Sequence, residues 1–258
     1  MANIFNSIRL KRPKRNVFNL SYENKLTMNM GELVPIMCMP IVPGDKFRVN
    51  TEALVRLAPL VAPMMHRVNV YTHYFFVPNR LVWNEWEDFI TKGIDGENTP
   101  VLPFINLAET YSQFASDANV RASFGDSTLW DYLGLPTLNG CGSKVYPSIV
   151  NGVTVPSGFR VSALPFRAYQ MIYNEYYRDQ NLTDPVDFAL TGGAVTADLS
   201  NLLVLRRRAW EKDYFTSALP WLQRGPEVTV PVGGAFGDVI LDKSVGSQQF
   251  IGNSGNRF

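Results

Sequence analysis

The sequence predicts a mainly β fold with helical insertions. Two observations lead to this prediction. Several segments alternate apolar and polar residues with the two-residue period of a half-buried strand, and prolines interrupt the chain where they would break regular central strands. The chain has 258 residues, of which 46% are hydrophobic and 18% charged. A chain of this length and composition can bury a sizeable core, so wholesale disorder is excluded.

The strand predictions rest on alternation. Residues 66–77 are the strongest candidate, because valines and aromatic residues occupy most even positions, whereas Arg67, Asn69, Tyr71 and His73 occupy odd ones. The further candidates are 46–51, 227–232 and 238–241. Prolines at 35, 40 and 43 remove ladder donors from 33–43, which is therefore predicted to be an edge strand or an extended tether.

Four segments are predicted to be helical: 79–93, 128–133, 166–179 and 202–217. In the first, Asn79 is the expected N-cap and Gly93 marks the end. Its apolar stripe consists of Val82, Trp83, Trp86, Phe89 and Ile90. Pro220 is expected to close the last helix. The stretches 95–125 and 134–160 are rich in proline and glycine, and they are predicted to be loops.

Positive charge is concentrated near the N-terminus, at Arg9, Lys11, Arg12, Lys14 and Arg15. Without these five, the 24 basic residues fall to 19 against 23 acidic ones, which leaves the body with a net charge of −4. A short basic arm on a mildly acidic body is typical of an interaction tail, often for nucleic acid. Five charges help to hold a polyanion without reading its sequence. A solvated, frayed terminus is the alternative.

The sequence offers few residues for catalysis or metal binding. The two histidines, His66 and His73, are seven residues apart, so on one strand they would face opposite sides of the sheet. Cys38 and Cys141 are too few for a disulfide framework or a cysteine-rich zinc site. The turn at Lys144 lacks the residue order of a phosphate-binding loop. No catalytic, cofactor-binding or metal-ligating residue is therefore predicted.

Two acidic clusters raise the alternative of a β-sandwich carbohydrate-active enzyme. They consist of Glu85, Glu87 and Asp88 in one predicted helix, and of Glu211 and Asp213 in another. Glycoside hydrolysis needs two carboxylates that converge in a cleft, and neighbours on one helix seldom do so. A solvated helix face is the favoured interpretation. A single-strand nucleic-acid-binding module is a further alternative, against which the net charge of the body argues.

Aromatic residues and arginines are the most telling feature, since both types are enriched at protein–protein interfaces. The subunit-interface candidates are Trp83, Trp86, Tyr173, Tyr176, Arg206, Arg207, Arg208, Trp210 and Trp221. The alternative for each aromatic residue is that it fills the core of its own chain.

Eight stretches give the chain a resemblance to a known family. They read NVFNLSY at 16–22, MGELVPIM at 30–37, VPGDKF at 42–47, LVAP at 60–63, VNVYTHYFFVP at 68–78, WNEWEDFI at 83–90, YNEYYRD at 173–179 and RAWEKDYFTSALPW at 208–221. Together they resemble, in order, the major capsid protein of the Microviridae, of the gokushovirus type.

The resemblance implies an eight-stranded viral jelly-roll β-sandwich with long insertions between its strands. It implies a structural protein without catalytic residues or cofactors, which forms pentamers and a small T=1 icosahedral shell around circular single-stranded DNA. The expected location is the virion, after assembly in the host cytoplasm and without a membrane. The basic arm is then expected to face the packaged DNA.

Members of this family are considerably longer than the present chain, so it is expected to represent their N-terminal part. The expected organisation is a basic arm at 1–20, the N-terminal part of the jelly roll at 21–225, and the truncated start of a further β region at 226–258. The jelly roll is then incomplete. A half-built sandwich leaves strand edges open and is expected to aggregate or refold poorly alone.

Overall fold

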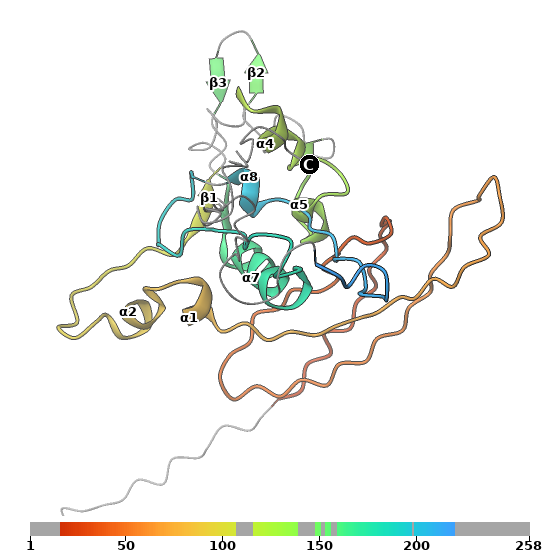
Figure 1. The fold of residues 1–258 in the computed structure, drawn as a ribbon. Helices are drawn as coiled ribbons and strands as arrows, with labels where there is room; N and C mark the ends of the chain where they lie inside the picture. The colour runs from red at the N-terminus through yellow and green to blue at the C-terminus, as the bar shows by residue number, and fades with distance from the viewer. Residues whose placement is uncertain are drawn as a thin grey trace, which may run out of the picture. The chain divides into compact units, whose positions relative to one another are not determined.

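The computed structural model describes residues 16–106, 116–138, 148–150, 153–155, 159–197 and 199–219 (Figure 1). The chain divides into two units, Met1–Ala209 and Trp210–Phe258. The named helices and strands belong to the first unit.

Most described residues of the first unit lie outside helices and strands, and the regular elements are mainly short helices. They are α1 (Asn79–Val82), α2 (Trp86–Thr91), α4 (Ala118–Ala122), α5 (Leu129–Tyr132), α7 (Leu164–Ile172) and α8 (Leu199–Leu202). A π-helix, η2 (Tyr173–Tyr177), extends α7 at its C-terminal end.

Four three-residue strands form two small antiparallel sheets. β1 (Phe104–Asn106) pairs with β4 (Arg160–Ser162), with Ile105 opposite Val161. β2 (Ser148–Val150) pairs with β3 (Val153–Val155) as a hairpin. The described residues therefore contain two two-stranded sheets, and an eight-stranded sandwich is not formed within this part of the chain.

The core of the first unit gathers around α7. Phe166 of α7 stacks on Trp130 of α5 with ring centroids 5.6 Å apart, and Phe124 meets the edge of Trp130 at 4.8 Å. Ile105 of β1 and the leucines of α8 complete this buried cluster. Large aromatic and branched residues bury the most apolar area per side chain, so this cluster is the main source of stability in the unit.

The prediction of one helix over 79–93 is only partly correct, because the structure breaks it into α1 and α2. Pro78, not Asn79, is the N-cap of α1. Trp83 is extended, with φ −153° and ψ 114°, and the backbone N–H of Asn84 donates to the carbonyl of Leu190 at 3.1 Å instead of to the preceding turn. A tertiary hydrogen bond has therefore replaced a helical one. The end near Gly93 is confirmed, since Lys92 and Gly93 both have positive φ.

Two other helix predictions are confirmed. Thr128 caps α5, within the predicted segment 128–133. The segment 166–179 contains most of α7 and all of η2, although α7 begins at Leu164 with a proline in its first turn. Proline is tolerated there because the first N–H groups of a helix have no partner inside it.

The helix predicted over 202–217 is wrong. The structure has only α8 at its start, and no helix follows in the described residues up to 219. The side-chain amide of Gln170 donates to the carbonyls of Leu202 and Val204, and the carbonyl of Arg206 accepts from the N–H of Leu33. Residues of other segments therefore form hydrogen bonds with backbone groups that would otherwise be paired within a helix.

The predicted strands at 46–51 and 66–77 are also absent. Residues 46–77 make no backbone hydrogen bond to any described segment, and Figure 1 shows them as an orange excursion that returns to the core at α1. Alternation of apolar and polar residues indicates a segment that can form a strand, but a strand also needs a neighbouring strand with which to form hydrogen bonds. Residues 33–43 likewise run as a tether, with an isolated bridge between Glu32 and Arg207 just before them.

The predicted loops contain short elements: β1 and α4 lie within 95–125, and β2 and β3 lie within 134–160. The strand candidates 227–232 and 238–241 lie outside the described residues.

Candidate subunit-contact surfaces

Trp83 is the anchor of the first group of predicted contact residues, at α1 and α2. Its side chain is 0% exposed, so within this chain it is a core residue. Trp86 and Phe89 pack on it, with ring centroids 6.0 Å and 5.1 Å from that of Trp83. Its indole N–H donates to the carboxylate of Glu85 at 3.3 Å. Trp83 thus provides the buried ring on which Trp86 and Phe89 of α2 pack.

The backbone around Trp83 is fixed by a buried arginine and a glycine. Arg167 of α7 donates to the carbonyl of Val82 at 3.1 Å and to that of Thr191 at 2.8 Å. Next to it, a Cβ on Gly192 would lie 2.4 Å from the carbonyl oxygen of Val101, so no other residue fits without a shift. These contacts join α1, α7 and the 190–193 segment.

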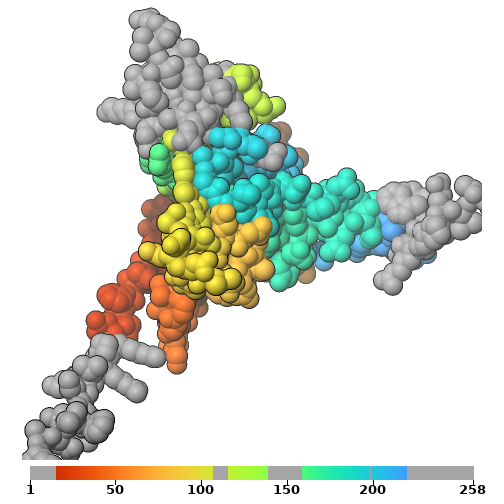
Figure 2. Space-filling model, turned by 90° about the vertical axis from the view of Figure 1, so that its left-hand side faces the viewer, coloured from red at the N-terminus to blue at the C-terminus, as the bar shows by residue number. Residues whose placement is uncertain are grey.

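Exposed apolar side chains lie in and next to α2. We call Leu81, Trp86, Phe89, Ile90 and Ile94 the α2 face. Ile90 is 62% exposed and Ile94 fully exposed, while Trp86 is half-buried. In Figure 2 the gold and yellow atoms of this region lie on the side turned to the viewer. An exposed apolar group of this kind, rimmed by charge, is typical of an interaction site.

The second group forms around η2. We call Tyr71, His73, Phe75, Tyr176, Tyr177 and Arg208 the aromatic–arginine cluster. Phe75 lies 4.8 Å from Tyr176 between ring centroids, and His73 stacks on Tyr177 at 5.8 Å. The Nδ1 of His73 and the hydroxyl of Tyr177 are 2.5 Å apart and share a hydrogen bond.

His73 and Phe75 thus pack on η2, while Tyr71 contacts His73 and Arg208. Residues 68, 70, 74 and 76 are exposed, and so is Tyr71. The π-helix contributes because its wider turn places two consecutive tyrosines, Tyr176 and Tyr177, against Phe75.

The three arginines of 206–208 have different roles. Arg206 donates to the side chain of Gln170 and the carbonyl of Asn201, and burial lowers its pKa without removing its charge. Arg207 forms an ion pair with Glu32 at 3.5 Å. Arg208 lies over Tyr71, with its guanidinium carbon 5.7 Å from the ring centroid. A guanidinium over a ring face is a cation–π contact that keeps its outer side open to a partner.

The remaining predicted site residues lie elsewhere. Trp210 belongs to the second unit and is 78% exposed. Tyr173 of η2 lies under the guanidinium of Arg206, at 5.6 Å. Trp221 and the five basic residues Arg9, Lys11, Arg12, Lys14 and Arg15 lie outside the described residues.

Four members of the aromatic–arginine cluster were not among the predicted contact residues: Tyr71, His73, Phe75 and Tyr177. The first three lie in the strongest strand candidate, whose even positions are the more apolar. The i, i+2 recurrence of rings at 71, 73 and 75 was the available signal.

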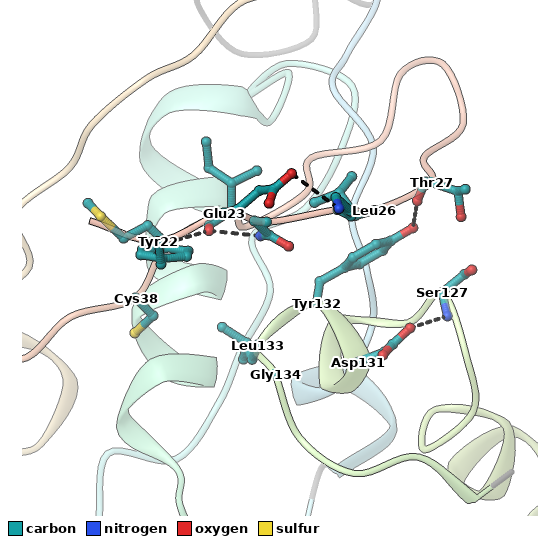
Figure 3. Close-up of a pocket in the computed structure, with 14 residues that line it drawn as sticks. Tyr22, Glu23, Leu26, Thr27, Cys38, Ser127, Asp131, Tyr132, Leu133 and Gly134 are labelled. Carbon is teal, nitrogen blue, oxygen red and sulfur yellow. Dashed lines mark hydrogen bonds and ion pairs between the residues drawn. The ribbon is translucent and has the colours of Figure 1, made fainter. Parts of the chain in front are cut away.

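A groove of about 650 Å³ lies between residues 22–38 and the end of α5 (Figure 3). Tyr132 donates to the carbonyl of Thr27 at 2.6 Å, and the carboxylate of Asp131 accepts from the N–H of Ser127. Cys38 faces this groove, and burial raises the pKa of its thiol, which opposes a reactive thiolate. The groove therefore offers no activated nucleophile.

Members of both acidic clusters make local contacts. The carboxylate of Asp213 accepts from the backbone N–H groups of Phe215 and Thr216, and Glu85 accepts from Trp83. No cluster of three metal-ligating side chains occurs among the described residues. In that same part of the chain, no helix has the length and apolarity needed to cross a membrane.

Comparisons with known proteins found one matching family model and several similar proteins. A family model described as capsid protein (F protein) matches residues 6–254. The chain is 35% identical over 246 residues to capsid protein VP1 of Chlamydia phage 1, covering 91% of this chain and 38% of that protein. It is 34% identical over 221 residues to capsid protein VP1 of Bdellovibrio phage phiMH2K, with 86% and 36% covered.

A third relative is capsid protein VP1 of Spiroplasma virus 4, 30% identical over 231 residues, with 85% of this chain and 36% of that protein covered. The chain therefore spans less than two fifths of the length of the curated relatives it matches.

Proposed function

The chain belongs to the capsid protein (F protein) family of the Microviridae, and we propose from this that it is a structural subunit of a T=1 icosahedral shell around a single-stranded DNA genome. Its place is then the virion, after assembly through pentamers in the host cytoplasm. Its role is structural and needs no catalytic residue or cofactor.

One observation carries this proposal beyond the family. Residues 46–77 combine strand-like alternation with exposed apolar side chains and with no backbone hydrogen bond to a described segment. Val70, Tyr74 and Phe76 are each more than half exposed. Unpaired N–H and C=O groups beside apolar side chains form a template for further strands. Such a segment supports an incomplete jelly-roll sheet that partner strands would finish.

A side-chain contact supports the same interpretation. The hydroxyls of Thr51 and Tyr74 are hydrogen-bonded, so the two strand candidates 46–51 and 66–77 approach each other there. Two such segments would become part of a sandwich if they paired in a fixed register and a second sheet packed on them.

Hydrogen exchange tests the unpaired segment. The amides of 46–77 are expected to exchange rapidly in the 258-residue chain and to become protected in the assembled product of the full open reading frame that contains it. The helix α7, which already has its hydrogen bonds, serves as the internal control and is expected to be protected in both. Amides of 46–77 that exchange equally fast in both forms would show that this segment never becomes a strand.

The basic arm is proposed to contact the packaged DNA. Neutralising Arg9, Lys11, Arg12, Lys14 and Arg15 to glutamine is expected to weaken binding to single-stranded DNA and to flatten its salt dependence. Because each neutralised phosphate contact on a single strand adds about −0.7 to the slope of log K against log salt, five contacts amount to about −3.5.

The matched control neutralises five exposed cations of the body: Lys46, Arg48, Arg56, Arg67 and Lys92. It is expected to change the slope less than the arm variant does. Equal slopes for the arm variant and the unaltered protein would overturn the role of the arm.

A further inference from the structure

Two exposed surfaces of the first unit carry opposite charge. Around the α2 face, residues 79–98 include five acids and two bases, a net charge of −3. Glu87 is exposed in the first turn of α2. The aromatic–arginine cluster carries Arg208, which has no ion pair among the described residues, next to Arg207, which Glu32 already neutralises. Glu175 is the acid of η2, and the arginines at 206–208 outnumber it and Glu32.

We propose that the α2 face of one copy of this chain docks on the aromatic–arginine cluster of the next copy. The contact rests on the proposed capsid role and names its surfaces. The apolar side chains Phe89, Ile90 and Ile94 would meet the rings of Phe75 and Tyr176, while the acids around them would meet Arg208.

Both surfaces are held rigid by their own fold, which favours binding. Trp86 and Phe89 rest on the buried Trp83, and Phe75 and Tyr176 pack on each other. The backbone of Arg208 is tied by its N–H to the carbonyl of Gly31 at 2.8 Å. Rigid aromatic anchors lose little conformational entropy when they bind, and tryptophan, tyrosine and arginine dominate binding energies at interfaces.

The two surfaces are different parts of the chain, so the contact is head-to-tail. In Figure 1, α2 lies to the left of α7, whereas the light-blue segment after α8 passes on its right. When two copies bind in this way, the α2 face of one copy and the aromatic–arginine cluster of the other remain free. Repeated, this contact closes into a ring if the rotation allows, as a pentamer requires.

A charge-swap experiment in the full open reading frame tests this pairing. The first variant is Glu87→Lys with Glu97→Lys, the second is Arg208→Glu, and the third carries all three changes. The first two place like charges opposite each other, so each is expected to raise the concentration needed for assembly by about tenfold or more. The third restores opposite charges and is expected to recover assembly. Sedimentation velocity measures the assembled fraction.

Matched controls separate a specific contact from a general charge effect. Asp184→Lys and Lys25→Glu reverse exposed charges outside both surfaces and outside residues 46–77, and they are expected to leave assembly unchanged. Circular dichroism and thermal unfolding of each variant establish that its subunit is folded.

The outcomes distinguish this inference from the capsid role itself. If the unaltered protein assembles and both single-surface variants assemble equally well, the pairing is wrong while the capsid role stands. If both variants fail and the swap does not recover assembly, these surfaces do not face each other. If the unaltered protein never assembles, the capsid role fails first.

Discussion

Arg167 is the one charged side chain among the fully buried described residues, and it shows how a single residue organises the first unit. Arg167 forms no ion pair with a carboxylate of the described residues. Its guanidinium instead donates to the carbonyls of Val82 and Thr191, which belong to α1 and to the segment before Gly192. Burial lowers its pKa, but an arginine remains charged at any physiological pH. The side chain thus joins three parts of the chain through hydrogen bonds.

We expect Arg167→Met to lower the free energy of unfolding by about 2 kcal/mol, because two buried carbonyl oxygens lose their donors while the packed volume is largely kept. Urea unfolding followed by tryptophan fluorescence measures the change. Arg80→Met, on the exposed side of α1, is the control and is expected to stay within about 0.5 kcal/mol. If the Arg167→Met variant were the more stable protein, burying the guanidinium would cost more than its hydrogen bonds return.

At the scale of elements, the sequence predicted well where local signals and tertiary contacts agree. Thr128 both starts an apolar turn and caps α5, and the ring spacing of 166–179 matches α7 and η2. The sequence-based prediction failed where the backbone groups of a segment form hydrogen bonds with another segment. The N–H of Asn84 and the carbonyls of Leu202 and Val204 bond to distant residues, so α1 is cut short and 202–217 is not a helix.

The exposure of the candidate interface residues could be predicted only in part, for the same reason. Sequence alone identifies Trp86 and Tyr176 as interface types, but only packing separates them from Trp83, which is buried. The cluster of Tyr71, His73 and Phe75 depends on which side of an extended segment meets η2. The side that packs depends on residues of η2, more than a hundred positions away in the sequence. The alternation of apolar and polar residues alone therefore does not predict it.

The turn at 213–216 is a described element of the second unit, and its stability is expected to depend on pH. The carboxylate of Asp213 accepts from the N–H groups of Phe215 and Thr216, and these bonds lower its pKa below the ordinary value. A depressed pKa means that the turn gains stability above the pKa of the unfolded chain. That gain is lost as pH falls through the lower native value.

NMR titration of the amides of Phe215 and Thr216 is expected to show them shifting together, with a midpoint below about 3.9, the ordinary value for aspartate. Asp213→Ala is expected to abolish this transition. A midpoint at or above the ordinary value would show that the carboxylate does not accept these bonds in solution.

At the scale of the whole molecule, the described chain combines a small helical core with a long apolar segment that finds no ladder. The core around α7 accounts for the folded part of the first unit, and residues 46–77 remain exposed beside it. A subunit that functions alone would bury such a segment. An assembly subunit presents it to further strands and to further copies.

The most direct test of this account is electron cryo-microscopy of the particles made by the full open reading frame that contains this chain. We expect closed shells of uniform diameter in which residues 46–77 form paired strands and the α2 face is covered by a second copy. Monomers alone, at every salt and protein concentration, would contradict the capsid role on which the account depends.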